Sequence, residues 1–164
     1  MTIRSMNSKI IATALSCALA LPALLVGSGL LAPSVAEAAV TKAACRVHAV
    51  EALEEGDGTI PAELAFMADQ LEAPEFGRYR SYNLIGVKSF ELELDREIEQ
   101  KFKSGHSVKL TLLGGEKGKL ELDTKLLRGS TTLVDLQFAV GSQLVLIPVR
   151  RGDSMVIFAY QCKK

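Results

Sequence analysis

Residues 107–127, "SVKLTLLGGEKGKLELDTKLL", hold the pattern that decides the fold. In "SVKLTLL" the apolar residues Val108, Leu110 and Leu112 alternate with polar ones, and "KLELD" repeats the pattern with two leucines. Strict alternation indicates a β-strand that buries one face and exposes the other. The glycine-rich "GGEKG" between the two runs is typical of a hairpin loop. The stretch therefore predicts two antiparallel strands that bury a row of leucines.

The same two-residue period extends over most of the chain, with glycine turns between the runs. Runs that are apolar on both faces, such as "SMVIFAYQC", are expected to be central or covered by a helix, and Pro148 indicates an edge strand or a bulge. We predict a mainly antiparallel β fold of about eight strands, either a β-barrel or a sandwich. Besides the opening hairpin, the predicted strands are CRVHAVEAL (45–53), YRSYNLIGV (79–87), SFELELD (89–95), IEQKF (98–102), TTLVDLQFAV (131–140), QLVLIPV (143–149) and SMVIFAYQC (154–162).

One segment, "IPAELAFMADQLEA" (60–73), has a helical period instead. Leu64, Met67, Ala68 and Leu71 recur at i, i+3, i+4 and i+7 and share one face of a helix. Prolines stand in its first turn and just after its end, as helix boundaries allow. The sequence therefore predicts one packed α-helix after the first strand.

The N-terminal part, residues 1–38, has a basic head, a long apolar middle and an Ala-Glu-Ala exit, as a secretory signal peptide does. We place cleavage between Ala38 and Ala39, and the mature chain, 39–164, suits a single domain that is periplasmic or secreted. The apolar run is also long enough for an uncleaved membrane anchor. Translation from Met6 would shorten the leader, and the sequence leaves both alternatives open.

The chain has three cysteines, and cleavage of the leader removes Cys17. Cys45 and Cys162 then lie near the two ends of the mature domain, and in an oxidising compartment such a pair predicts a disulfide. Closing so long a loop contributes about 4–5 kcal/mol in the chain-entropy model, which usually overestimates the gain. Zinc binding by these cysteines with His48 and His106 is the alternative, but the separations fit no usual zinc module.

The composition argues against several function classes. The formal net charge is +0 and tryptophan is absent, so neither nucleic acid nor an anionic surface is an expected partner. No nucleophile, base and orienting group stand in a catalytic pattern; His106 and Ser107 are adjacent and would face different ways on a strand. We predict no catalytic residue, no metal site and no cofactor.

Three short motifs have simpler interpretations as turns. "RRGDS" (150–154) contains an adhesion tripeptide, but Gly-Asp also favours a hairpin turn. "GGEKGK" (114–119) lacks the spacing of a phosphate-binding loop. "EEGDG" (54–58) is acidic, but it lacks the calcium-loop pattern.

A longer stretch, "IPAELAFMADQLEAPEFGRYRSYNLI" (60–85), resembles a group of small exported bacterial proteins of unassigned function. The resemblance implies export and a single β-rich domain, and it brings no functional residue with it. Its motifs are a Pro-x-x-Leu helix (Pro61, Leu64, Leu71), then Pro74 and Phe76, then Tyr79, Ser81 and Tyr82 leading to Leu84.

The leading functional hypothesis is a non-enzymatic exported domain that binds a protein, an envelope component or a small apolar ligand. One alternative is a small outer-membrane β-barrel, although the strands are short for it and aromatic residues are few. The other is a secreted enzyme of unrecognised type. The mature domain is not expected to be embedded in a membrane.

Overall fold

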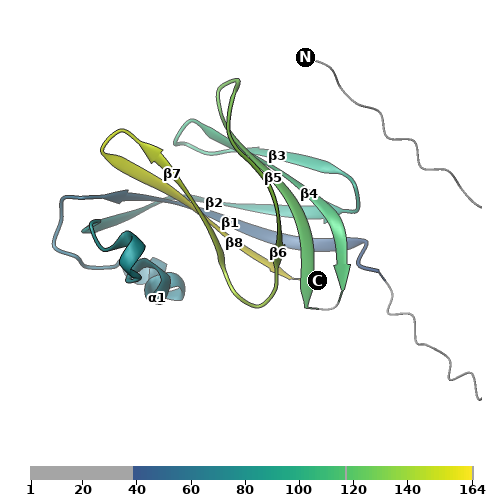
Figure 1. The fold of residues 1–164 in the computed structure, drawn as a ribbon, viewed down its shortest axis with the longest axis horizontal. Coiled ribbons are helices and arrows are strands. Elements are labelled where there is room, and N and C mark those ends of the chain that lie inside the picture. The colour runs from purple at the N-terminus through teal and green to yellow at the C-terminus, as the bar shows by residue number, and fades with distance from the viewer. Residues whose placement is uncertain (1–38, 117, 164) are drawn as a thin grey trace, which may run out of the picture. The chain divides into compact units, whose positions relative to one another are not determined.

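The computed structural model of the chain describes residues 39–116 and 118–163 (Figure 1). They form two four-stranded antiparallel sheets and a short helical segment. The predicted signal peptide, residues 1–38, and the cleavage before Ala39 lie at or beyond the boundary of the described residues, so both stay predictions.

The strands account for most of the domain, as the sequence predicts. Their bounds are β1 (Lys42–Leu53), β2 (Ser81–Glu93), β3 (Glu97–Lys101), β4 (His106–Glu116), β5 (Lys119–Arg128), β6 (Thr131–Val140), β7 (Val145–Arg151) and β8 (Ser154–Lys163).

The two sheets pack as a sandwich. Sheet A has the order β2-β1-β8-β7 and sheet B the order β3-β4-β5-β6. The first and last strands, β1 and β8, pair directly, as the predicted disulfide suggests. A closed barrel would also need pairing of β2 with β3 and of β6 with β7, and the described residues show neither. Of the two predicted architectures, the sandwich is therefore the one observed.

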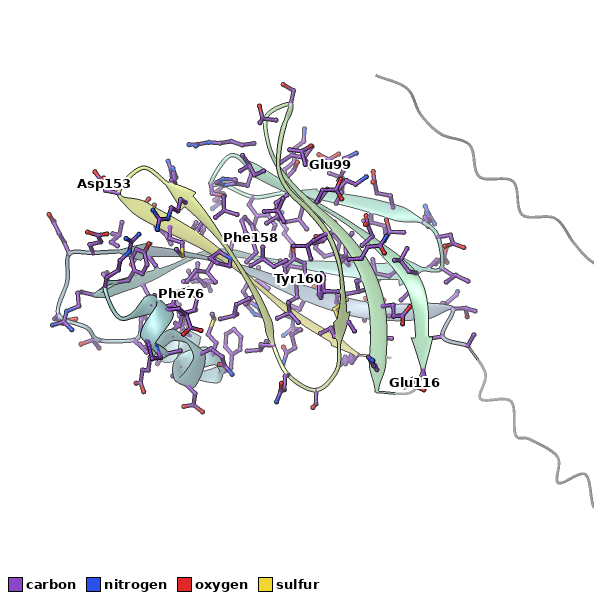
Figure 2. All side chains as sticks on the ribbon, in the orientation of Figure 1. Phe76, Glu99, Glu116, Asp153, Phe158 and Tyr160 are labelled. Carbon is purple, nitrogen blue, oxygen red and sulfur yellow. A yellow bond between two sulfur atoms is a disulfide. The ribbon has the colours of Figure 1, made fainter. Side chains whose placement is uncertain are left out.

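The core between the sheets consists of the alternating residues that the sequence singles out. Val108, Leu110 and Leu112 of β4 are fully buried, and they pack with Phe158 and Tyr160 of β8 (Figure 2). Removing one such side chain from water stabilises the fold by about 1.5–3 kcal/mol. Alternation thus places the leucines inside and their charged neighbours outside.

One polar pair lies within this core. The hydroxyl groups of Thr124 and Tyr160 are 2.9 Å apart, and the Thr124 hydroxyl donates to the carbonyl oxygen of Lys109. Burial raises the pKa of the Tyr160 hydroxyl above its usual range. Each buried hydroxyl therefore has a partner, as buried polar groups require.

Two strand predictions need correction. The runs 79–87 and 89–95 are one strand, β2, because no glycine or proline turn separates them. A register shift opposite Ala49 and Val50 lets this long strand follow β1. Pro148 does lie on an edge strand, β7, as predicted.

The predicted helix is broken into shorter pieces. It consists of a 3₁₀ helix, η1 (Ala62–Met67), one turn of α-helix, α1 (Ala68–Leu71), and a second 3₁₀ turn, η2 (Pro74–Phe76). Neither η1 nor α1 has a side-chain N-cap, and a 3₁₀ helix aligns residues three apart. The predicted apolar face persists, because Leu64, Met67 and Leu71 are buried.

This helical segment covers one end of the outer face of sheet A (Figure 1). There Leu64 and Met67 pack in a second apolar cluster with Val50, Ile157 and Ala159 of the two central strands. Sheet A is therefore buried on both faces at that end, which explains why β8 is apolar on both sides.

Candidate functional site

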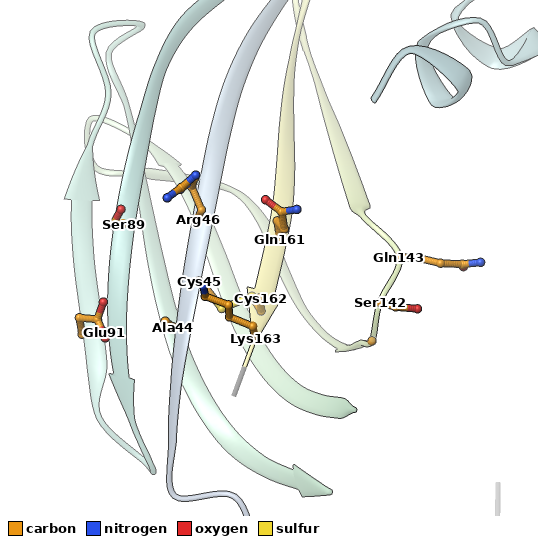
Figure 3. Close-up of a pocket in the computed structure, with 11 residues that line it drawn as sticks. Ala44, Cys45, Arg46, Ser89, Glu91, Ser142, Gln143, Gln161, Cys162 and Lys163 are labelled. Carbon is orange, nitrogen blue, oxygen red and sulfur yellow. A yellow bond between two sulfur atoms is a disulfide. The ribbon is translucent and has the colours of Figure 1, made fainter. Parts of the chain in front are cut away.

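The other end of the same outer face is not covered by the helical segment, and it holds an open hollow of about 420 Å³ (Figure 3). The register of sheet A builds two rows of residues across it. Arg46 of β1 pairs with Ser89 of β2 and with Gln161 of β8. The next row places Ala44 between Glu91 and Lys163.

The link between β6 and β7 forms a further wall of the hollow. It contributes Gly141, Ser142 and Gln143, of which Ser142 and Gln143 are exposed. Two neighbouring hollows share Gly141 and Ser142 with the first. Segments far apart in the chain therefore bring hydroxyl, amide, guanidinium and carboxylate groups together around one open surface.

Cys45 and Cys162 lie at the base of this hollow. The two cysteines are partners in the β1–β8 register, and their sulfur atoms are at disulfide distance. The predicted pairing is thus confirmed. The crosslink joins the strands that bear Arg46 and Gln161, so it holds these two side chains in fixed register.

The charge of the hollow centres on Arg46. Its side chain is exposed, and no salt bridge to it is found among the residues that the structure describes. Lys163 adds a second positive charge and Glu91 a negative one. Such a surface can bind an anionic or amide-bearing group, since Arg offers several donors in a planar fork.

An apolar rim separates the hollow from the covered end. The rings of His48 and Phe66 have centroids 4.5 Å apart, while Phe66 keeps 41% and Val87 40% of its surface exposed. Burial lowers the pKa of His48, and the nearby Arg46 lowers it further. The exposed surface thus changes from apolar to polar along β1.

The two histidines do not join a metal site with the cysteines. His48 is on the outer face of sheet A, whereas Cys45 belongs to the core between the sheets. His106 is buried near Phe158, with ring centroids 5.7 Å apart. Among residues 39–116 and 118–163, no group of three or more potential metal ligands is found.

His106 also forms no dyad with Ser107. Its Nδ1 lies 3.0 Å from the hydroxyl of Ser104 instead. Burial lowers the pKa of His106, and Arg128 and Arg151 lower it further. Burial therefore favours the neutral form of this imidazole.

The three motifs lie in a loop or at the ends of hairpin strands. Gly152 and Asp153 form the tip of the β7–β8 hairpin (Figure 2), and the Arg151 guanidinium donates to a Glu51 carboxylate oxygen over 3.3 Å. Of "GGEKGK", Gly114 to Glu116 are the last residues of β4 and Lys119 is the first residue of β5, so the predicted loop is mostly strand. In "EEGDG", the Asp57 carboxylate accepts a hydrogen bond from the Thr59 amide.

Sequence reasoning missed Arg46, Gln161 and the 141–143 link as members of one site. The signal was present in the cysteines: if Cys45 faces Cys162 in an antiparallel pair, Arg46 must face Gln161. Gln161 is also the one polar interruption in the run from Met155 to Cys162. The contribution of the β6–β7 link, by contrast, depends on how the sheets stack.

No protein-family model, curated protein or solved structure matches this chain. Within the part of the chain that the structure describes, none of the helices has both the length and the apolar character that crossing a membrane would require.

Proposed function

We propose that this chain is an exported, non-enzymatic binding domain whose binding surface is the Arg46 hollow. The hollow comprises Arg46, Gln161, Ser89, Glu91, Lys163 and the 141–143 link. The observation that supports the proposal is the exposed Arg46, aligned with Gln161 over a disulfide-linked strand pair. Such a strand pair favours binding because the backbone beneath the hollow does not have to be ordered when the partner arrives.

The chemistry of the hollow favours a protein or an envelope component over a small apolar ligand. The core residues between the sheets are almost wholly buried, whereas pockets for apolar ligands are lined mainly by apolar side chains. The groups that converge here are instead polar, with two positive charges and one negative charge. The expected partner therefore presents a carboxylate, phosphate or amide group to Arg46.

The binding surface can be tested by site-specific photo-crosslinking in the native compartment. A photoreactive residue in place of Gln161 should capture a defined partner, which mass spectrometry then identifies. The control position is Glu121, which is exposed on a central strand of sheet B. Adding Arg46→Glu to the Gln161-labelled chain should abolish capture. Equal capture from both positions, or capture unaffected by Arg46→Glu, would contradict the proposal.

Export is tested separately by intact mass of the protein recovered from its native compartment. The mass should correspond to a chain that begins at Ala39, and alkylation should modify Cys45 and Cys162 only after reduction. A full-length chain with free thiols would refute export with an oxidised crosslink.

A further inference from the structure

Each sheet ends in two edge strands, and three of these four strands have features that discourage further pairing. Charged residues, proline, short length and register shifts all protect an open edge. β3 has five residues, mostly charged, and β7 contains Pro148. β2 has a register shift near its middle and several charged residues.

The fourth edge strand, β6, has less such protection, since its one register shift lies near its start, at Leu133. Its ten residues contain no proline and a single charged residue, Asp135, whose carboxylate lies 3.8 Å from the ammonium group of Lys125. Its pairing with β5 is regular from Val134 to Val140. Among the described residues no strand occupies its outer edge, so a row of backbone donors and acceptors is open there.

The side chains of β6 would also gain from an added strand. Val134, Leu136 and Phe138 pack against the core but are only partly buried. The Phe138 ring reaches Tyr160, with centroids 5.3 Å apart. A strand placed along this edge would therefore bury further apolar surface while it satisfies the open backbone groups.

We propose that two copies of this chain associate through their β6 strands, paired antiparallel with Gln137 at the two-fold axis. Such a pairing uses the whole regular stretch of β6. It is self-complementary, as a two-fold interface must be. The facing pairs are Gln137 with Gln137, Leu136 with Phe138, Asp135 with Ala139 and Val134 with Val140.

Use of the whole regular stretch 134–140 places the axis at Gln137, and the charge on β6 is compatible with this register. Centring the pair on Asp135 instead would place two carboxylates directly opposite each other, which is destabilising. With the two-fold axis at Gln137, each Asp135 faces Ala139 of the other copy and keeps its contact with Lys125 of its own copy. Apolar residues then face apolar residues on the inner side. A second copy thus fits the edge without any like-charge contact.

The proposed dimer is independent of the proposed binding function. It uses sheet B and no residue of the Arg46 hollow, so loss of the dimer and loss of partner capture are separate results. If the dimer and the binding function are both correct, the dimer presents two Arg46 hollows that are related by the two-fold axis.

The test is sedimentation equilibrium of the mature, oxidised protein over a wide concentration range. The wild-type protein should show a monomer–dimer equilibrium. Gln137→Lys places two ammonium groups opposite each other and should weaken dimerisation by up to about fivefold. Within one copy the new lysine faces Asp123, so thermal unfolding measured at low concentration should not shift downward.

Thr111→Lys is the matched control, because Thr111 also faces Asp123 but lies on the central strand β4. It should leave dimerisation unchanged. Gln137→Glu alone should also weaken the dimer and, because it faces Asp123 within one copy, should lower thermal stability slightly; an equal mixture of Gln137→Lys and Gln137→Glu chains should restore association. A wild-type protein that is monomeric throughout, a dimer insensitive to Gln137→Lys, or a mixture that fails to associate would each overturn the proposal.

Discussion

The outer face of sheet A has a covered end and an open end that share the same two central strands. At the covered end β1 and β8 present Val50, Ala52 and Ile157 to the helical segment. At the open end the same strands present Arg46 and Gln161 to solvent. The difference shows that a change of side-chain polarity along two strands, with no change in the β1–β8 register, decides where a layer docks and where a surface stays free.

The largest effect should come from the covered end. Leu64→Ala removes a fully buried side chain and should lower the free energy of unfolding by about 2–5 kcal/mol. Urea denaturation measures the change. Phe66→Ala, in the same 3₁₀ helix but 41% exposed, is the control and should cost clearly less. Equal losses would mean that the helical segment is not a packed layer.

The next effect concerns the open end. Replacing Cys45 and Cys162 together by alanine should lower the free energy of unfolding by about 2–4 kcal/mol. The amides of β1 and β8 near the crosslink should lose the most hydrogen-exchange protection. The amides near Val50 and Ile157 should lose only the protection that follows from the lower free energy of global unfolding. Uniform loss at both ends would show that the two ends form one cooperative unit.

The smallest effect is the response to acid. Burial lowers the pKa of both His48 and His106 below the usual value of 6.5, so the unfolded chain binds protons first as the pH falls. Stability should therefore be complete above pH 6.5 and decline below it. Urea denaturation at pH 7.5 and pH 5.5 should show the decline, and His48→Gln should reduce it. If the free energy of unfolding depends on pH equally in the wild-type protein and in His48→Gln, then His48 is solvated like the residues of the open end.

Much of this organisation follows from local pattern. The two-residue alternation predicts the strands and the inward-facing leucines of β4 and β5. A strand that buries only one face is enough to produce this alternation. The disulfide follows from the position of two cysteines near the two ends of the predicted mature domain. Pro148 at an edge follows from its missing amide hydrogen.

What the pattern leaves open depends on contacts between distant segments. The choice of sandwich over barrel rests on whether β2 pairs with β3, and no local signal encodes that. The division of the helix into 3₁₀ and α turns reflects how Leu64 and Met67 fit a particular sheet surface. The hollow required the β1–β8 register together with the position of the 141–143 link, so single-residue reasoning did not reveal Arg46.

The pairing of β1 with β8 also brings the two ends of the domain together, because Ala44 lies opposite Lys163. A segment attached after Lys163 leaves beside β1, and one attached before Ala39 leaves near the point where the Val40 amide donates to the Gly115 carbonyl oxygen of β4. A short linker between those ends would allow circular permutation, with new termini opened at the exposed β5–β6 turn around Gly129. The same geometry suits insertion of the whole domain into a surface loop of another protein.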